Sequence, residues 1–396
     1  MNKILWLASW YPNEMDMYTG DFIKRQAEAV SLTTPIDVLF AGKHKRQTET
    51  PPQANPVHKN NFEDLHERIL YYYSDEKERS VFTRLKSFYN YFNTHLKEIK
   101  KLRKEDSLPD LIHVHVAMKS GLVALYLKWK YKIPYIVTEH WSGYYPQSRD
   151  ALFKKSFLER ICTIRILKNA SYLLPVSQAL GEQIHNHWAP IRFKPIPNVV
   201  NTKYFFYEEK RAPSVFRFVH VSTLAYPKNP EGIVRSFIEL QKSGFPSELV
   251  LVGPVNPDLV KIIDSTGLYR NSIHCTGELP YEQVAAEMKR SNALVLFSYY
   301  ENLPCVILEA LCTGIPVIAS RVGGIPEIVN DENGLMVEAG NENQLLRAMQ
   351  TMIKEYTAYN LSLISKKAIL KFSYETVAKQ ITEVYDAVLA KKDKQN

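Results

Sequence analysis

The most constraining feature of the sequence is a repeated alternation of short apolar runs with longer amphipathic stretches, in two successive series. Such alternation is typical of strand-helix-strand units and a mostly parallel sheet. The first series has candidate strands at 3–10, 36–41, 111–116, 134–138 and 172–176. The second has them at 216–222, 248–252, 272–275, 294–297, 316–319 and 334–337. We therefore expect an α/β fold of two doubly wound Rossmann-like domains facing one another across a ligand-binding cleft.

The helical patterns and the breaks between them predict the domain limits. Candidate helices lie at 21–31, 82–104, 119–131, 151–168, 178–187, 230–242, 258–265, 281–290 and 304–313. The pattern breaks around 195–214, and a last helix at about 374–391 follows the completed second series. We expect domains at 1–205 and 206–372, with 373–396 crossing back to pack on the first. The polar, proline-containing segment 43–61 is expected to be a long mobile loop, either a passive insertion or part of an acceptor site.

Composition narrows the class of protein. The chain has 396 residues, 45% of them hydrophobic and 23% charged, as in ordinary folded proteins. No run approaches the roughly 20 apolar residues that span a bilayer, and the apolar start, 4–11, is interpreted as a buried strand rather than a signal peptide. The four cysteines are scattered and no pair has CxxC spacing. These observations predict a cytoplasmic protein with reduced thiols and no metal site.

Charge is distributed unevenly between the two halves. Residues 1–200 carry 29 Lys and Arg against 20 Asp and Glu, whereas 201–396 carry 21 against 22. A basic half suits a phosphate-bearing substrate, an anionic membrane or nucleic acid, although solvated lysines give the same excess. The basic and aromatic stretch 82–104 could lie on a membrane. Packing of its aromatic side in the core is the favoured interpretation, and the absence of a nucleic-acid motif argues against nucleic acid.

The densest chemical signal is the segment 298–310, in which Glu301 and Glu309 lie eight positions apart. Pro304 is a favoured residue for starting the helix that carries Glu309. A loop-to-helix junction exposes backbone N–H groups that can bind phosphate or hydroxyl-rich ligands. Spacing alone does not distinguish such a site from an amphipathic helix carrying two glutamates. The segment 312–328 follows, with a helix stop at Gly314, a buried strand and a Gly-Gly turn.

Taken together, 298–310 and 312–328 resemble the signature of family 4 of the retaining glycosyltransferases, which have the GT-B fold. Glu301 and Glu309 match the E-x7-E motif of that family. Weaker matches follow in the same order as in the family, and they are Pro12 to Gly20, Asp110 to His115, Thr138 to His140, Pro197-Asn198, Val221-Ser222 with Lys228-Asn229, Thr276-Gly277, and Phe372 through Tyr385. The resemblance covers nearly the whole chain and is weakest over 43–105.

The resemblance implies an acceptor-side first domain and a second domain that binds a nucleotide-sugar. It implies catalytic roles for His140, Lys228 and Glu301. The lysine offsets charge on the leaving diphosphate, and the histidine hydrogen-bonds the donor sugar. The implied donor-binding residues are Gly20, Ser222, Thr223, Lys228, Gly277, Glu301, Asn302, Leu303, Pro304 and Glu309, of which Glu309 binds the ribose and Pro304 has no N–H to give.

The family usually has an arginine about five residues before its lysine, and this chain has Thr223 there. The diphosphate contact is therefore weaker or supplied otherwise.

His113 and His115 alternate along one strand and point to the same side. We expect His113 to pack in the core or cleft and assign His115 a candidate role in binding the acceptor.

The sequence therefore predicts a retaining, metal-independent glycosyltransferase without a cofactor, which moves a sugar from a UDP-sugar, or a GDP-sugar, to a hydroxyl acceptor. The basic first half predicts a lipid-linked or polysaccharide acceptor of bacterial surface glycan synthesis and peripheral attachment to the inner face of the cell membrane. Two alternatives stay open. One is a GT-B sugar-nucleotide epimerase, and the other is a glycan- or nucleotide-binding protein without turnover.

Overall fold

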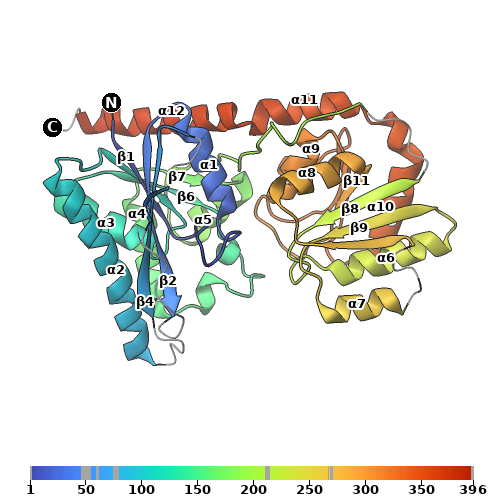
Figure 1. Ribbon diagram of the computed structural model, residues 1–396, viewed down its shortest axis with the longest axis horizontal. Coiled ribbons are helices and arrows are strands. Elements are labelled where there is room, and N and C mark those ends of the chain that lie inside the picture. The colour runs from blue at the N-terminus through green and yellow to red at the C-terminus, as the bar shows by residue number, and fades with distance from the viewer. Residues whose placement is uncertain are drawn as a thin grey trace. The chain divides into compact units, whose positions relative to one another are not determined.

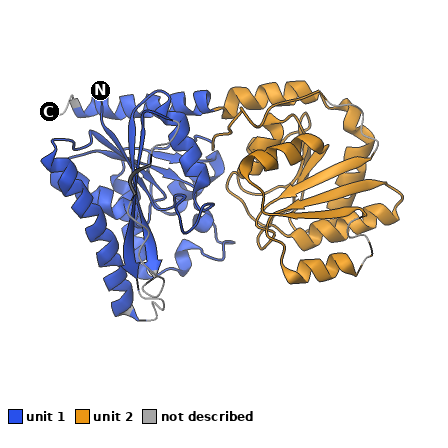
Figure 2. Cartoon of the chain, viewed as in Figure 1, with its two compact units in different colours: residues 1–197, 374–396 blue, residues 198–373 orange. Residues whose placement is uncertain are grey.

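The computed structural model describes residues 2–45, 55–58, 62–74, 80–209, 215–265, 267 and 271–393. The chain forms two compact units (Figure 2). Unit 1 comprises residues 1–197 and 374–396, and unit 2 comprises residues 198–373.

Unit 1 contains a seven-stranded sheet in the order β3-β4-β2-β1-β5-β6-β7. Figure 1 labels β1, β2, β4, β6 and β7 of this sheet. Its strands are β1 (Ile4–Ala8), β2 (Ile36–Lys45), β3 (Asn55–His58), β4 (Leu65–Ser74), β5 (Leu111–His115), β6 (Tyr135–Glu139) and β7 (Leu173–Pro175). All neighbours pair in parallel except β3, which is antiparallel to β4. Its helices are α1 (Asp21–Ser31), α2 (Val81–Lys104), α3 (Ser120–Tyr131), α4 (Phe157–Asn169), α5 (Gln178–His187) and α12 (Tyr374–Asp393), with short 3-10 helices η1 (Ser142–Tyr144) and η2 (Leu152–Lys154).

The apolar start of the chain forms the central strand of this sheet. All five residues of β1 are buried, and β1 pairs with β2 on one side and β5 on the other. A parallel strand covered on both faces reads as a continuous apolar run, which explains the pattern from Ile4 to Ala8.

A buried polar network ties α12 to the strands of unit 1. The indole N–H of Trp6 donates to the hydroxyl of Tyr385 over 3.0 Å, and that hydroxyl lies 2.7 Å from Nδ1 of His113. Because the hydroxyl already accepts from Trp6, we assign its proton to the bond with His113. The Nε2–H of His113 then donates to Thr138 over 2.6 Å. Three strands and the last helix are thus joined by directed bonds.

Unit 2 contains a six-stranded parallel sheet in the order β10-β9-β8-β11-β12-β13. Its strands are β8 (Phe216–Val221), β9 (Ser247–Val252), β10 (Ile273–Gly277), β11 (Ala293–Leu296), β12 (Val317–Ser320) and β13 (Gly334–Val337). Its helices are α6 (Pro230–Lys242), α7 (Pro257–Asp264), α8 (Tyr281–Arg290), α9 (Cys305–Cys312), α10 (Glu342–Glu355) and α11 (Leu361–Phe372), with short 3-10 helices η3 (Ile325–Glu327) and η4 (Tyr356–Ala358). The doubly wound sheets expected from the sequence are confirmed in both units.

Helix starts in unit 2 follow local sequence signals. The side chains of Asn229 and Asn256 cap α6 and α7 by accepting from the backbone N–H three residues on, and a proline follows each asparagine. Asparagine at the cap and proline in the first turn both favour initiation. Once started, α6, α7 and α10 bury their apolar sides in one cluster with the strands, centred on residues such as Phe218, Phe237 and Met349.

One expectation was incomplete, and three elements were missed. The expected loop 43–61 is partly β-structure, because 43–45 extend β2 and 55–58 form β3, while 46–54 and 59–61 lie outside the described residues. Strand β4 was missed. So were α10 and α11, although α10 buries an apolar side in the core of unit 2.

The favoured interpretation of α2 was also wrong in part. Tyr91 packs in the core, but Phe82, Leu85, Phe88 and Tyr89 are exposed. In the part of the chain that the structure describes, no helix is long and apolar enough to span a bilayer.

We predict that Tyr385→Phe lowers the free energy of unfolding by roughly 2 kcal/mol, because it leaves the Trp6 N–H and His113 Nδ1 buried without a partner. Thermal unfolding measures the effect. The matched control is Tyr374→Phe, at the start of the same helix, which removes one partly buried bond to Glu28. Equal thermal midpoints for the two variants would contradict the prediction.

Candidate active site

The residues predicted from the sequence divide between the two units. Gly20, His115 and His140 lie in unit 1, and the remaining predicted residues lie in unit 2. His140 follows β6 and Gly277 ends the edge strand β10, but the others lie at or after the carboxyl ends of strands that border the point where the strand order of their unit reverses. That point lies between β8 and β11 in unit 2 and between β1 and β5 in unit 1. In open α/β sheets ligands bind at this position, outside the carboxyl ends of the strands.

Unit 2 brings Lys228 and Glu301 together. Lys228 lies in the loop after β8 and Glu301 in the loop after β11, and the two strands are neighbours. The ammonium Nζ lies 2.5 Å from carboxylate Oε1, and the hydroxyl of Ser298 donates to the same oxygen over 2.7 Å. The side chains are 22% and 10% exposed, so the ion pair is largely removed from water. A cation and a carboxylate meet where the fold places ligands.

The Gly-Gly turn fixes the backbone beside Glu301. Gly323 has a φ of +54°, and a Cβ there would lie 1.9 Å from the carbonyl oxygen of Glu301. The next N–H, that of Gly324, donates to the carbonyl of Asn302 over 2.7 Å. Glycine at 323 is therefore required by close approach of two backbones, as the sequence predicted for this turn.

The segment that leads into α9 is held from a second direction. The side-chain amide of Asn198 donates to the carbonyl of Leu303 over 3.2 Å. Pro304 precedes the helix, and Glu309, on its second turn, is 5% exposed. Burial, with Glu309 as a smaller contributor, raises the pKa of the Cys312 thiol well above its usual range. Cys312 is therefore a neutral packing residue.

Ser222 is held by a buried histidine. The Nδ1–H of His220 donates to the carbonyl of Val295 over 2.8 Å, which leaves Nε2 to accept from the Ser222 hydroxyl over 2.7 Å. The serine oxygen accepts in turn from the N–H of Leu224 over 2.9 Å. Burial lowers the pKa of His220 to about 4, so the neutral ring braces the loop near neutral pH. The sequence analysis missed His220. The one feature of the sequence that points to it is its position near the end of β8, two residues before Ser222.

Two predicted donor-binding positions contribute no side-chain hydrogen bond or ion pair among the described residues. Thr223 is exposed at the start of the β8–α6 loop. Gly277 ends β10 with a φ of +75°, and a Cβ there would meet open space, so its conformation rather than packing favours glycine. Neither position supplies the positive charge of the arginine that the resemblance leads one to expect.

The backbone conformation and close contacts at position 20 in unit 1 require a glycine. Gly20 caps α1 with a φ of +81°, and a Cβ would lie 2.6–2.8 Å from backbone atoms of Trp10 and Tyr11. This approach explains the glycine without a ligand. The ligand-binding role of Gly20 stays a prediction.

The histidines of unit 1 form a stack with an indole ring. His115 lies over Trp6 with ring centroids 4.0 Å apart, and His140 is nearly parallel to His115 at 5.8 Å. Neither ring nitrogen of His115 has a hydrogen-bond partner among the described residues, and burial lowers its pKa well below the usual range. His113 is buried, as expected. The ring of His115 is buried as well, which does not favour direct contact with an acceptor, and that role stays a prediction.

Glu139 is a residue of unit 1 to which the sequence assigned no role. Its side chain is fully buried and accepts four hydrogen bonds. Oε1 accepts from the N–H groups of His140 and Trp141 at 3.0 and 2.9 Å, and Oε2 accepts from the N–H of Ala117 and the hydroxyl of Tyr144 at 3.0 and 2.8 Å. Burial raises the pKa of Glu139, and the four donors oppose that rise by favouring the carboxylate. Glu139 joins the loops after β5 and β6 and fixes the backbone of His140.

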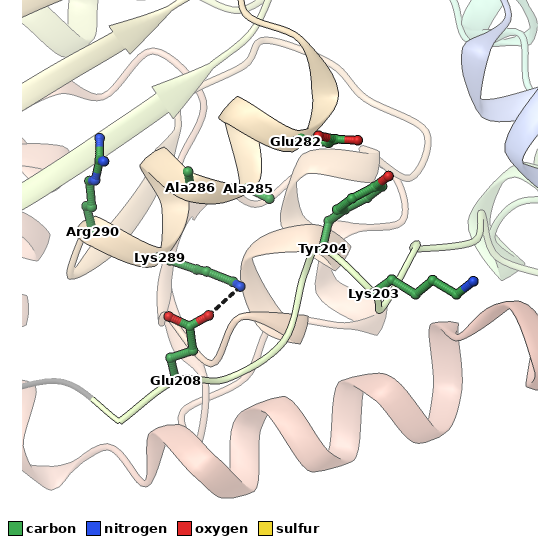
Figure 3. Close-up of a pocket in the computed structure, with 8 residues that line it drawn as sticks. All are labelled: Lys203, Tyr204, Glu208, Glu282, Ala285, Ala286, Lys289 and Arg290. Atoms are coloured by element: carbon green, nitrogen blue, oxygen red, sulfur yellow. Dashed lines mark hydrogen bonds and ion pairs between the residues drawn. The ribbon is translucent and has the colours of Figure 1, made fainter.

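A separate hollow of about 370 Å³ lies beside α8 of unit 2. Figure 3 shows Lys289 reaching the carboxylate of Glu208 there, over 2.6 Å, and the same ammonium lies 3.3 Å from the ring centroid of Phe206. None of the predicted site residues lines this hollow. Among the described residues, no group of three or more His, Cys, Asp or Glu side chains is placed to hold a metal ion.

Comparison with known proteins assigns the family. Residues 206–367 match the family model described as glycosyl transferases group 1, and residues 58–204 match that of glycosyltransferase family 4. The chain belongs to glycosyltransferase family 4 and has the GT-B fold.

One curated relative is similar over nearly its whole length, and two solved structures share the fold. The chain is 26% identical to the Bacillus subtilis protein TuaC, named as a teichuronic acid biosynthesis glycosyltransferase, over 96% of this chain and 94% of TuaC. Sucrose-phosphate synthase from Thermosynechococcus elongatus superposes with a TM-score of 0.77 at 20% identity, covering 98% of this chain and 100% of that structure. Anabaena HepE, in complex with UDP-glucose, superposes with a TM-score of 0.69 at 18% identity and the same coverage.

We predict that Glu139→Gln lowers kcat of the transfer reaction by roughly tenfold or more. An amide has one acceptor oxygen, so its NH2 group would face the N–H of Ala117 or those of His140 and Trp141, and the loop carrying His140 would shift. The measurement is kcat and KM well below the melting temperature. The matched control is Tyr144→Phe, which removes one donor and keeps the carboxylate. An unchanged kcat in the glutamine variant would limit Glu139 to a role in stability.

Proposed function

We propose that this glycosyltransferase moves a sugar from a nucleoside diphosphate sugar, with UDP favoured over GDP, to a hydroxyl group of a glycan or lipid-linked acceptor in bacterial surface glycan synthesis. The reaction retains the configuration at the transferred carbon and uses no metal. The observation that carries the proposal is the Lys228–Glu301 ion pair at the strand-order reversal of unit 2.

In the proposed reaction the donor separates the two side chains of this ion pair and binds to both of them. The diphosphate takes the ammonium of Lys228, whose charge stabilises the leaving group as the sugar bond breaks. Glu301 is then free to accept hydrogen bonds from hydroxyl groups of the transferred sugar, and Glu309 accepts from the ribose. The exchange costs little because each charge keeps a partner of opposite sign or a hydrogen-bond donor.

The remaining interactions position the acceptor and the donor sugar for the reaction. The acceptor attacks the face that the diphosphate leaves, and the departing phosphate helps to take the acceptor proton, while His140 hydrogen-bonds the donor sugar. Holding the reactants in place supplies much of the rate in such a mechanism. The side chain of Lys228 supplies positive charge at the diphosphate, which supports a reaction without a metal.

The names of similar proteins support the choice of donor and acceptor. HepE is described in complex with UDP-glucose, and TuaC is named for teichuronic acid biosynthesis. Two alternatives remain. A binding protein without turnover is motivated by exposed Thr223 in place of a second cation, and a sugar-nucleotide epimerase is another GT-B enzyme, which would need no acceptor. Incubation with a panel of UDP- and GDP-sugars, with and without acceptor, followed by mass spectrometry for a transfer product and NMR for an epimer of the same mass, separates them. Formation of an epimer without acceptor, and of no transfer product with acceptor, would overturn the transferase proposal.

We predict that Lys228→Ala and Glu309→Ala each lower kcat/KM at least a hundredfold, because each removes a contact to the donor worth several kcal/mol. Steady-state transfer with the donor found by the panel measures the loss. The matched control is Lys242→Ala, which removes a surface lysine paired with Glu239 in the same unit. Full activity in both site variants, with unchanged melting temperature, would contradict the site assignment.

Peripheral attachment to an anionic membrane is part of the proposal, and α2 supports it. Phe82, Leu85 and Tyr89 are 74%, 56% and 66% exposed, and their spacing of three and four residues puts them on one side of the helix. Lys97 and Lys100 are exposed further along the same helix. Exposed apolar side chains combined with lysines are typical of helices that lie at the surface of a bilayer.

We predict that the protein sediments with phosphatidylglycerol vesicles at low salt and much less with phosphatidylcholine vesicles. Replacing Lys97, Lys100, Lys101 and Lys104 with Gln should weaken this binding at least tenfold, since each lysine near an anionic surface contributes about 1 kcal/mol. High salt should act in the same direction. Equal binding to both lipids, or none at low salt, would remove the membrane from the proposal and leave a soluble acceptor.

A further inference from the structure

A large hollow lies at the amino edge of the sheet in unit 1. It has a volume of about 1410 Å³ and lies between α3 and α12, over the chain segments that lead into β6 and β7. We call it the basic groove, because its cationic lining residues are Lys128, Lys132, Arg192, Lys194, Lys391 and Lys392. No residue predicted for the transfer reaction lines it.

The groove has an excess of positive charge that the protein leaves uncompensated. Glu383 is the single carboxylate in the lining, and it pairs with Lys194 over 3.2 Å. Lys132, Arg192 and Lys391 have no carboxylate partner in the described parts of the chain. Cations gathered in a concave surface strengthen one another's attraction for an anion. The occupant that fits the groove therefore carries several negative charges.

Aromatic rings lie among these cations. Trp129 is 73% exposed at the groove, and the guanidinium of Arg192 lies 5.0 Å from the ring centroid of Tyr172. The C–H groups of a pyranose ring pack on the electron-rich face of an aromatic side chain, and carboxylates or phosphates bind guanidinium and ammonium groups. Rings and cations side by side suit a sugar chain that bears acidic groups.

The shape of the groove argues against a bilayer as its occupant. A flat membrane does not enter a concave surface, and the groove presents one large exposed apolar side chain, Trp129. The apolar side chains suited to a bilayer lie on α2 instead. A flexible chain can follow the hollow and place successive charges against successive cations.

The groove is distant from the transfer residues of unit 1. Lys132 and Tyr172 precede strands β6 and β7, whereas His140 follows β6. A strand of five residues is about 16 Å long. A chain held in the groove therefore contacts the enzyme on the edge of the sheet opposite His140.

We propose that the basic groove is a second binding site, separate from the transfer site, for an extended polyanionic glycan. The site retains a growing acidic chain on the enzyme through uronate or phosphate groups that bind Arg192, Lys132 and Lys391, with a sugar ring on Trp129. This binding does not depend on the identity of the sugar that the enzyme transfers.

The test uses the full chain and an oligogalacturonate of about eight sugars as the polyanionic probe. Calorimetry should show saturable binding that weakens as salt rises, and maltooctaose, a neutral chain of the same length, should not bind. Arg192→Ala combined with Lys391→Ala should weaken binding of the acidic chain at least tenfold. Trp129→Ala should weaken it severalfold.

The matched control is Lys97→Ala combined with Lys100→Ala on α2, which removes the same charge outside the groove. This variant should bind the acidic chain as the wild type does, and all variants should keep the wild-type melting temperature. Donor turnover with a short acceptor, measured in parallel, should be unchanged in the groove variants, so failure of the groove proposal is distinguishable from failure of the transfer proposal.

Three results would overturn the proposal. One is absence of binding to the acidic chain at low salt, and another is equal weakening by the groove and α2 variants, which would mean attraction to overall charge. The third is a groove variant that loses binding to phosphatidylglycerol vesicles and keeps binding to the acidic chain, which would assign the groove to the membrane.

Discussion

The candidate chemistry of this enzyme depends on a property of parallel sheets, which is that neighbouring strands end at the same edge. In unit 2 the first strand, β8, has β9 on one side and β11 on the other, so the loops after β8 and β11 diverge from adjacent strand ends. That geometry brings Lys228 within 2.5 Å of Glu301 although 73 residues separate them in the chain. The surrounding contacts serve to keep these loops in place. Gly323 allows the backbone at Glu301 to be approached closely, and His220 holds Ser222 at the start of the other loop.

Much of the fold could be predicted from the sequence, because buried parallel strands are continuous apolar runs and the helices between them begin at proline and asparagine signals. Strand β4 was missed because its buried side includes Glu67, which accepts from the hydroxyl of Tyr11 over 2.5 Å. A buried carboxylate interrupts the apolar pattern, and only the folded chain supplies its partner. The exposed aromatic side of α2 was misjudged for the converse reason, since apolar spacing on a helix does not reveal whether anything covers it.

The candidate site likewise contains some residues that could be identified from the sequence and others that could not. Lys228 and Glu301 could be singled out because a long motif carries them, and the structure adds the contact between them. Glu139 and His220 could not, because each acts by directing hydrogen bonds to groups on other strands, and no sequence pattern records that. Two buried carboxylates thus differ in kind. Glu301 faces a cation at the edge of the sheet, whereas Glu139 is enclosed by four neutral donors and has no charged partner among the bonds that hold it.

The path of the chain through the two units has a consequence for biosynthesis. Unit 2 is a continuous segment, 198–373, whose two ends meet where the N–H of Val200 donates to the carbonyl of Phe372 over 2.8 Å. Unit 1 begins before this segment and is completed only after it, by α12. On the ribosome, unit 2 can therefore fold before Tyr385 is synthesised. Until then Trp6 and His113 of unit 1 lack the hydroxyl group that bonds to both of them. Synthesis of unit 1 starts first and is completed last. A nascent chain that is released before α12 is made would therefore contain all of unit 2 and an incomplete unit 1.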